Sequence, residues 1–212
     1  MPEDTHHYKL TYFDIRALGE PIRLLFRYVE QEFEDNRISW DNWPAHKPKT
    51  PYGKLPILDV DHGRFILTQS SAIARFIAEK YGLTGKGEEE QARVNELLDF
   101  QKDFFAEMIK YIVVKNGFVE GDEEKLYREL FLPGLERTLP VWVKILKKSK
   151  SEFLVDSGLT FADFFVADFL QTIKQFEPEM VAKHSELENY VERVYSLPTI
   201  QEYIKRRKYY VE

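Results

Sequence analysis

The chain has 212 residues, of which 43% are hydrophobic and 15% aromatic, so a disordered polypeptide is excluded and one large domain or two smaller ones can form a core. A formal net charge of −6 argues against nucleic acid as the main partner. Because the chain lacks cysteine, disulfides, a catalytic cysteine thiolate and cysteine-ligated metals are also excluded, and any thiol chemistry must use the sulfur of a ligand.

Neither a metal site nor a membrane segment is expected. The five histidines form one adjacent pair and three single residues, without metal-ligand spacing. The N-terminus lacks an apolar run of signal-peptide length, and no segment approaches the roughly 18 apolar residues of a membrane span. We therefore expect a soluble, cytoplasmic protein.

The first 82 residues alternate strand and helix patterns. Tyr8–Phe13 is predicted as a strand, and Pro21 opens a helix whose apolar residues recur at helical spacing. Phe33–Ile38 is predicted as a second strand, followed by an irregular segment rich in tryptophan. Two further strands and a helix complete the order βαβ, ββα, which is typical of a thioredoxin-like domain.

The stretch Pro51–Tyr81 has the clearest signal for a ligand site. Apolar runs on either side of Asp61–Gly63 predict a short hairpin, and a helix follows from Ser70. The first amides of a helix have no partner within it, so they suit a carboxylate. Pro56 cannot donate a backbone hydrogen bond, which leaves Leu55 to offer its amide and carbonyl to an extended ligand. An ordinary strand-edge proline and a serine N-cap would explain these residues equally well.

From Gly87 onward the pattern is helical throughout, which marks a change of domain. Residues 83–87 are the predicted linker, because glycines end the preceding helix and free the chain. The predicted domains are residues 1–82 and 88–212. The predicted fold class is α/β plus all-α, with an N-terminal thioredoxin-like domain and a C-terminal helical bundle domain.

Within the second domain a long helix is expected from Val94, and a further helical region over residues 123–148 contains two prolines that bend or interrupt it. Thr160 and Asp163 match a capping box at the start of another helix. The basic run Lys205–Lys208 is interpreted as the solvated end of the last helix, where it suits the helix dipole.

Five motifs occur in order along the chain: YKLTYFDIRALGEPIR, DNWPAHK, YGKLPIL, LTQSSAIARFIA and LTFADFF. With these motifs the chain resembles a cytosolic glutathione transferase over nearly its whole length, and the sigma class in particular. The resemblance implies a homodimer that takes glutathione as its co-substrate. It also implies that the Leu55–Pro56 peptide bond is cis, because the family keeps a cis proline there to receive the cysteinyl part of glutathione.

By position in this family Tyr12 would be the catalytic residue, and its hydroxyl would donate a hydrogen bond to the glutathione sulfur. A free thiol with a pKa of about 8.5 is only a few per cent thiolate at neutral pH. A charge-assisted hydrogen bond of about 1.5 to 3 kcal/mol would lower that pKa by about 1 to 2 units. Tyrosine, with a pKa of about 10, acts here as a donor rather than a base. Without the resemblance, Tyr12 would be interpreted as a core aromatic residue of a strand.

The resemblance also assigns residues to glutathione binding. They are Tyr12, Trp43, Lys47, Gly53, Lys54, Leu55, Gln69, Ser70 and Asp103. Trp43 and Lys47 would contact the glycyl end, Lys47 through its charge. Residues 53–55 would form the loop before the cis proline, where Leu55 would pair its backbone with the cysteinyl amide.

The γ-glutamyl group would be held by Gln69 and Ser70, and Asp103 of the other subunit would reach its amine. By itself Asp103 would be interpreted as a solvated charge beside Lys102, so this assignment depends on a dimer. Tyr52 occupies the place where relatives insert an aromatic side chain into the partner subunit. A local packing role is the alternative for Tyr52.

Three positions depart from the pattern of the family. Many relatives carry an arginine six residues after the catalytic tyrosine, where this chain has Leu18, while Arg16 lies two residues earlier. Vertebrate prostaglandin D synthases of this class have two adjacent aspartates where this chain has Lys102 and Asp103, and the lysine would repel a divalent ion. They also have a tryptophan where this chain has Lys110. Prostaglandin isomerisation is therefore less well supported than conjugation.

The second substrate, a small hydrophobic electrophile, is expected beside apolar and aromatic residues. These are Phe13, Leu18, Phe105, Met108, Tyr209 and Tyr210. The functional hypothesis is a detoxifying glutathione transferase that conjugates glutathione to such electrophiles and also reduces lipid hydroperoxides. The alternatives are a glutathione-dependent prostaglandin H to D isomerase, and a non-catalytic carrier of hydrophobic ligands or crystallin-like relative.

Overall fold

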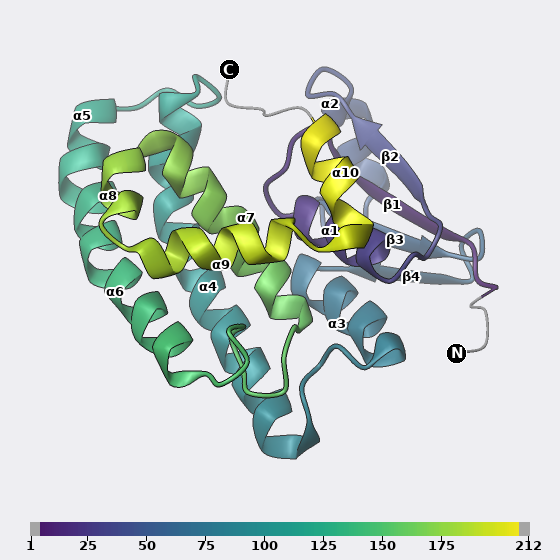
Figure 1. The fold of residues 1–212 in the computed structure, drawn as a ribbon. Coiled ribbons are helices and arrows are strands. Elements are labelled where there is room, and N and C mark those ends of the chain that lie inside the picture. Colours follow the sequence, from purple (N-terminus) through teal and green to yellow (C-terminus); the bar gives the residue numbers. More distant parts are fainter. Residues whose placement is uncertain (1–4, 208–212) are drawn as a thin grey trace. The chain divides into compact units, whose positions relative to one another are not determined.

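The computed structural model describes residues 5–207, and these residues form two compact units. The first unit contains residues 5–84 together with 195–207, and the second contains residues 85–194. The first unit contains a sheet and the second is built from helices (Figure 1), which confirms the predicted fold class. No helix within the described range is long and apolar enough to cross a membrane.

The sheet of the first unit is mixed and has four strands. They are β1 (Tyr8–Phe13), β2 (Glu34–Ile38), β3 (Ile57–Val60) and β4 (Phe65–Thr68). Their order in the sheet is β2-β1-β3-β4, with β1 parallel to β2 and the other neighbours antiparallel. Phe13 pairs with Ile38, so the carboxyl ends of the two parallel strands meet at one edge of the sheet.

Helices complete the first unit. They are α1 (Glu20–Tyr28), α2 (Trp43–His46) with a following 3-10 turn (Lys47–Lys49), α3 (Ser70–Tyr81) and α10 (Pro198–Arg206). Helices α1 and α3 pack side by side, and α10 also contacts α1 (Figure 1). Because of that contact, the division into compact units differs from the sequence-based domains 1–82 and 88–212, which place α10 with the other C-terminal helices.

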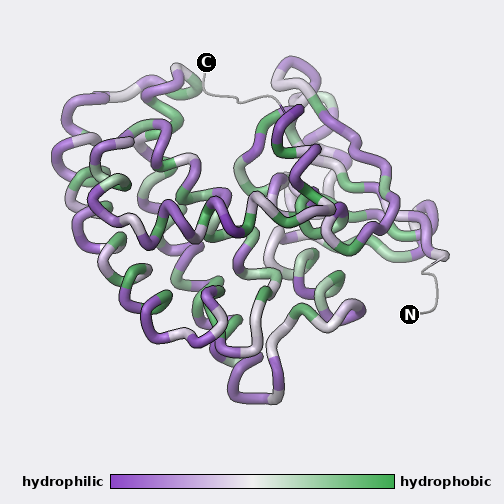
Figure 2. The backbone as a smooth tube through the Cα atoms, viewed as in Figure 1, coloured by the Kyte–Doolittle hydropathy of each residue, from purple (hydrophilic) through white to green (hydrophobic). Residues whose placement is uncertain are grey.

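The second unit is all-helical. Its elements are α4 (Gly87–Lys115), α5 (Glu123–Leu126), a π-helical turn (Tyr127–Phe131), α6 (Leu132–Lys148), α7 (Phe161–Phe176), α8 (Pro178–Ala182) and α9 (Ser185–Tyr195). Helix α4 begins before the predicted start at Val94. Pro133 lies in the first turn of α6, and Pro140 lies inside α6 without ending it. Hydrophobic and hydrophilic residues alternate along these helices (Figure 2), as expected where one helical face packs in a core.

Helix α7 begins with the capping box predicted from Thr160 and Asp163. The Asp163 carboxylate accepts hydrogen bonds from the Thr160 amide at 2.7 Å, the Leu154 amide at 3.0 Å and the Tyr190 hydroxyl at 3.0 Å. Burial raises the pKa of Asp163 to about 6, although these donors lower it. The start of α7 is therefore occupied by groups of the second unit itself.

Candidate active site

Tyr12 lies near the carboxyl end of β1 and is 6% exposed. Its hydroxyl oxygen accepts a hydrogen bond from the backbone amide of Leu18 at 3.3 Å. Burial raises the pKa of Tyr12 to about 12, although the Leu18 amide and the charge of Arg23 lower it. A tyrosine hydroxyl that accepts a hydrogen bond still has its own proton to donate. Tyr12 can therefore act as a hydrogen-bond donor at neutral pH and well above it.

Gly19, at the start of α1, packs directly against the ring of Tyr12. A Cβ atom at residue 19 would lie 2.7 Å from Cγ of Tyr12, closer than such atoms approach in proteins. Only glycine therefore lets α1 begin this close to the ring. The sequence interpretation did not assign this role, and the available signal was the position of Gly19 immediately before the helix-opening pair Glu20 and Pro21.

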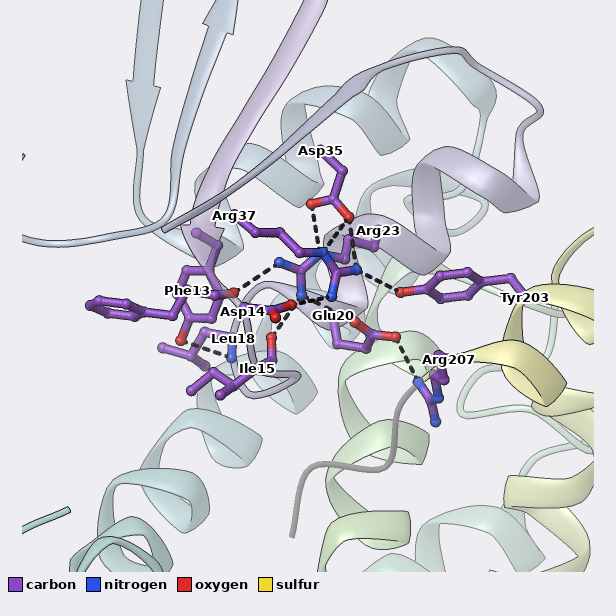
Figure 3. A network of polar contacts seen from close by, with 11 residues as sticks. Phe13, Asp14, Ile15, Leu18, Glu20, Arg23, Asp35, Arg37, Tyr203 and Arg207 are labelled. Atoms are coloured by element: carbon purple, nitrogen blue, oxygen red, sulfur yellow. Dashed lines mark hydrogen bonds and ion pairs between the residues drawn. The ribbon is translucent and has the colours of Figure 1, made fainter. Parts of the chain in front are cut away.

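Arg23 holds the turn that follows Tyr12. Its buried guanidinium donates to the carbonyl oxygens of Phe13 at 3.1 Å and Ile15 at 2.7 Å (Figure 3). It also forms ion pairs with Glu20 at 3.2 Å and Asp35 at 2.9 Å. One buried cation thus links β1, the turn, α1 and β2, and it fixes the backbone that carries the Leu18 amide to the tyrosine.

The charge network continues outward from Arg23 in two directions (Figure 3). Glu20 pairs with Arg207 at 2.9 Å, and both side chains are 2% exposed. Arg37 pairs with Asp14 and Asp35, each at 2.8 Å. The interpretation of the basic run at the end of α10 as solvated is therefore wrong for Arg207, because a buried carboxylate compensates its charge.

The residues predicted for the glycyl and cysteinyl parts of glutathione lie between α2 and β3. Trp43 begins α2 and is half-buried, whereas Lys47 and Lys54 are exposed. Lys47 lies over Gly53, since its Cε is 3.6 Å from the place of a Cβ at residue 53. The Leu55–Pro56 peptide bond is cis, as the resemblance implies.

Gln69 and Ser70 form the junction between β4 and α3. Thr68 pairs with Ile57 across the hairpin, so this junction lies beside the segment that enters β3. Gln69 has a φ of 71° and a ψ of 116°, a conformation that residues other than glycine rarely adopt and that is found at binding and active sites. Ser70 is buried as the first residue of α3. Within the described part of the chain, the Gln69 side chain makes no capping hydrogen bond, so it leaves the first amides of α3 to other partners.

Other predicted residues have less direct support. Asp103 is exposed on α4 in the second unit, and its assignment to a dimer contact stays a prediction. Met108 is fully buried and is therefore a core residue, whereas Phe105 is half-buried against Phe169. Tyr209 and Tyr210 lie outside the described residues.

Comparison with known proteins identifies the family. A family profile described as "Glutathione S-transferase, N-terminal domain" matches residues 8–79, and one described as "Glutathione S-transferase, C-terminal domain" matches residues 89–207. "Glutathione S-transferase 1" of Ascaris suum is 44% identical over 200 residues, which are 94% of this chain and 96% of that protein. The chain belongs to the glutathione S-transferase family. As a member of this family it is an enzyme that uses glutathione as its co-substrate.

Among solved structures with the same fold, one is described as monomeric, one as Nu-class and one as a prostaglandin synthase. Monomeric Na-GST-3 of Necator americanus is 42% identical with a TM-score of 0.88, over 97% of this chain and 100% of that one. A Nu-class transferase of Haemonchus contortus is 37% identical with a TM-score of 0.85, over 97% and 98% of the two chains. Prostaglandin synthase D of Nilaparvata lugens is 30% identical with a TM-score of 0.85, over 96% and 100%. These similarities support the family without selecting the sigma class.

Proposed function

We propose that this transferase is a sigma-class enzyme that conjugates glutathione to small hydrophobic electrophiles, and that it reduces lipid hydroperoxides with the same thiol. The supporting observation is the buried Tyr12 hydroxyl, whose pKa is raised to about 12, so that it remains a donor. Its hydrogen bond to the glutathione sulfur would lower the thiol pKa by about 1 to 2 units. In conjugation, the sulfur forms a bond to the electrophilic carbon, the thiol proton passes to solvent, and the displaced electron pair leaves with the leaving group or is protonated on the acceptor. In hydroperoxide reduction, the sulfur takes the outer oxygen as the O–O bond breaks and the alcohol leaves, and a second glutathione then forms the disulfide and releases water.

Positive charge near the sulfur would come from Arg23. Residue 18, where many relatives have arginine, is leucine and contributes only its backbone amide to Tyr12. The guanidinium carbon of Arg23 lies 5.9 Å from the centre of the Tyr12 ring, and its charge lowers the pKa of Tyr12. A lower tyrosine pKa strengthens the hydrogen bond that the hydroxyl donates. Arg23, which is itself paired with Glu20 and Asp35, would thus supply part of the electrostatic contribution that Leu18 lacks.

The glutathione site extends from α2 to the start of α3. Trp43 and Lys47 hold the glycyl end, with the Lys47 ammonium near the glycyl carboxylate. Residues 53–55 form the loop that receives the cysteinyl part, which adds to the sheet edge like a short strand. Gln69 and Ser70 hold the γ-glutamyl carboxylate, which the amides and dipole at the start of α3 attract.

We further propose a cytoplasmic homodimer with a role in detoxification. Tyr52 is 70% exposed in the loop before Gly53, and Phe65 and Ile66 of the edge strand β4 are 38% and 41% exposed, so the first unit offers large apolar side chains to a partner subunit. In a dimer, Asp103 of one subunit reaches the γ-glutamyl amine bound by the other.

Sedimentation of the wild type and of Tyr52→Ala tests the dimer: the wild type should sediment as a dimer and the variant should dissociate more readily. If the wild type sediments as a monomer, Asp103 cannot reach glutathione bound by another subunit, and its assignment would be wrong.

The test of the function compares two reactions of the purified protein with glutathione. Conjugation of chlorodinitrobenzene is the expected activity. Isomerisation of prostaglandin H to prostaglandin D is the second candidate, favoured by the similarity to a prostaglandin synthase D but opposed by Lys102 and Lys110. If the protein isomerises prostaglandin H but does not conjugate chlorodinitrobenzene, the isomerase function would replace the conjugating one. Binding of glutathione without either product would identify a non-catalytic relative.

A further inference from the structure

Arg207, the residue that follows α10, lies in the interior of the first unit. Its Nη1 donates to Oε1 of Glu20 at 2.9 Å, and both side chains are 2% exposed. The other carboxylate oxygen of Glu20 pairs with Arg23 at 3.2 Å, and the Arg23 side chain is fully buried. One carboxylate therefore bridges two guanidinium groups away from solvent (Figure 3). It connects the end of α10 with Arg23, which holds the turn after Tyr12.

The charges around Glu20 balance one another. In the described part of the chain, the ion-paired members of this network are three arginines and three carboxylates: Arg23, Arg37, Arg207, Asp14, Glu20 and Asp35. Burial and the charge of Glu20 raise the pKa of the neighbouring Tyr203 to about 12, so this hydroxyl stays neutral. Arg27 lies over the ring of Tyr203, 4.0 Å from its centre, and Arg207 lies over the ring of Tyr195 at 4.7 Å. Removing the charge of Glu20 or of Arg207 therefore leaves the buried part of the network with an uncompensated charge.

Arg23 connects this charge balance to Tyr12. It donates to two carbonyl oxygens of the turn, and its guanidinium carbon lies 5.9 Å from the centre of the Tyr12 ring. Charges in a protein interior are screened less than in water, so a change of charge at Glu20 or Arg207 acts beyond the groups that it touches. A net negative charge beside the turn disfavours a thiolate at Tyr12, and a net positive charge favours it.

We propose that Arg207 is a positioning residue for the activation of sulfur: acting through Glu20 and Arg23, it sets how strongly the turn and Tyr12 stabilise the glutathione thiolate. A network that only holds the fold would respond to the loss of a cation and to the loss of an anion with the same kind of damage. A network that tunes the sulfur responds to the two losses in opposite directions. The proposal rests on the proposed function, because it concerns the thiolate that Tyr12 would stabilise.

The test titrates the thiol of bound glutathione in the wild type, Arg207→Gln and Glu20→Gln. The ultraviolet absorbance of the bound thiolate and the kcat for chlorodinitrobenzene at saturating glutathione are measured against pH. Arg207→Gln should raise the pH midpoint of both by about 0.3 to 1 pH unit, because a cation is lost, and Glu20→Gln should lower it by a similar amount, because an anion is lost. The double variant keeps the charge balance, so its pH midpoint should lie within about 0.2 pH unit of the wild type.

Two further variants control for charge and for position. Arg207→Lys keeps the cation and should keep the pH midpoint within about 0.2 pH unit of the wild type. Arg64→Gln also removes a cation from the first unit, but Arg64 is 58% exposed and pairs with Asp61 at the turn between β3 and β4. Solvent screens its charge, so this variant should also stay within about 0.2 pH unit. Each variant is measured below its thermal unfolding midpoint, so that a loss of folding does not enter the comparison.

Shifts of equal sign would overturn the proposal. If Arg207→Gln and Glu20→Gln move the pH midpoint in the same direction, or if neither moves it, the network holds the fold without tuning the sulfur. Failure of the proposed function has a different signature, which is seen in the wild type itself: the bound thiol would ionise at its free value of about 8.5, and no conjugate would form above the rate of the uncatalysed reaction. That result would remove the site of thiolate stabilisation, and the positioning role of Arg207 with it.

Discussion

The turn after β1 and the start of α3 are built differently, although both would hold parts of one glutathione molecule. The turn depends on buried side chains from distant parts of the chain: Arg23 reaches the carbonyl oxygens of Phe13 and Ile15, and Glu20 pairs with Arg207, 187 residues away. The proposed activation of sulfur therefore depends on tertiary structure, and substitutions far from Tyr12 in sequence can disturb it.

The start of α3, by contrast, is formed by the backbone of neighbouring residues. Gln69 takes a positive φ and Ser70 opens the helix. The start of α7 is a structural cap and differs from the proposed binding site at α3, because there Asp163 and Thr160 satisfy each other. The capping residue of α3 makes no such bond and leaves the first amides of the helix for the proposed ligand, whereas the capping box of α7 occupies them.

The largest expected effect follows from removing the centre of the buried network. Arg23→Met should lower the free energy of unfolding by about 3 to 5 kcal/mol, because it leaves buried carboxylates and carbonyl oxygens without their donor. Urea unfolding measures this loss. Arg64→Met is the matched control: Arg64 pairs with Asp61 at 2.8 Å but is 58% exposed, so its loss should cost about 0 to 1 kcal/mol. Equal losses in the two variants would mean that the network does not hold the turn.

Tyr12→Phe should have the next largest effect. Without the hydroxyl, kcat/KM should fall about 10- to 100-fold, which is the contribution expected of a charge-assisted hydrogen bond, while the KM for glutathione stays nearly constant. Steady-state conjugation kinetics measure both constants. The control is Tyr8→Phe, a buried tyrosine on the same strand whose hydroxyl contacts Lys80 rather than the turn. If Tyr12→Phe keeps full activity, the proposed hydrogen bond from the Tyr12 hydroxyl does not activate the glutathione sulfur.

Most of the start of α3 could be predicted from sequence because its causes are local. The apolar runs of the hairpin and Ser70 lie within a few residues of the helix they precede, and the predicted hairpin and helix are both present. The strand Tyr8–Phe13 and the capping box of α7 were predictable for the same reason. The positive φ of Gln69 was not, because no sequence signal requires a glutamine to adopt it.

The surroundings of Tyr12 could be predicted only in part. The resemblance selects Tyr12 itself. The residues around it are brought together by tertiary contacts, which leave no helix or strand periodicity in the sequence. Arg207 looked like one charge in a solvated run, although it is buried against Glu20. Gly19 was likewise missed, since its close approach to the Tyr12 ring becomes visible only when the sheet is assembled.

Ser70→Ala should have a smaller effect and a different kinetic signature. Loss of one hydroxyl contact to the γ-glutamyl carboxylate should raise the KM for glutathione about 3- to 10-fold and leave kcat nearly unchanged, because the contact binds ground state and transition state alike. Ser71→Ala is the matched control, since Ser71 is also buried in the first turn of α3 but is not assigned to the ligand. A fall in kcat with constant KM would instead assign Ser70 to the chemistry and remove the difference between the two regions.

The smallest expected effect is a plateau in the pH dependence of conjugation. Activity should rise as the bound thiol ionises, and after correction for the uncatalysed reaction it should change less than about twofold between about pH 9 and 11. The reason is that burial raises the pKa of Tyr12 to about 12, so the hydroxyl stays a donor over this range.

The same pKa also fixes the sign of a stability effect. The folded protein keeps the Tyr12 proton after an unfolded chain has lost it, so this contribution to stability is complete below about pH 10 and is lost as the pH rises to about 12. Tyr12→Phe should remove this part of the alkaline decline and should shift the activity inflection up toward the free thiol value of about 8.5. A fall in wild-type activity centred near pH 10 would show that Tyr12 ionises as an exposed tyrosine does. In that case solvent would reach the Tyr12 hydroxyl, and the turn after β1 would not be the buried, network-held region that distinguishes it from the start of α3.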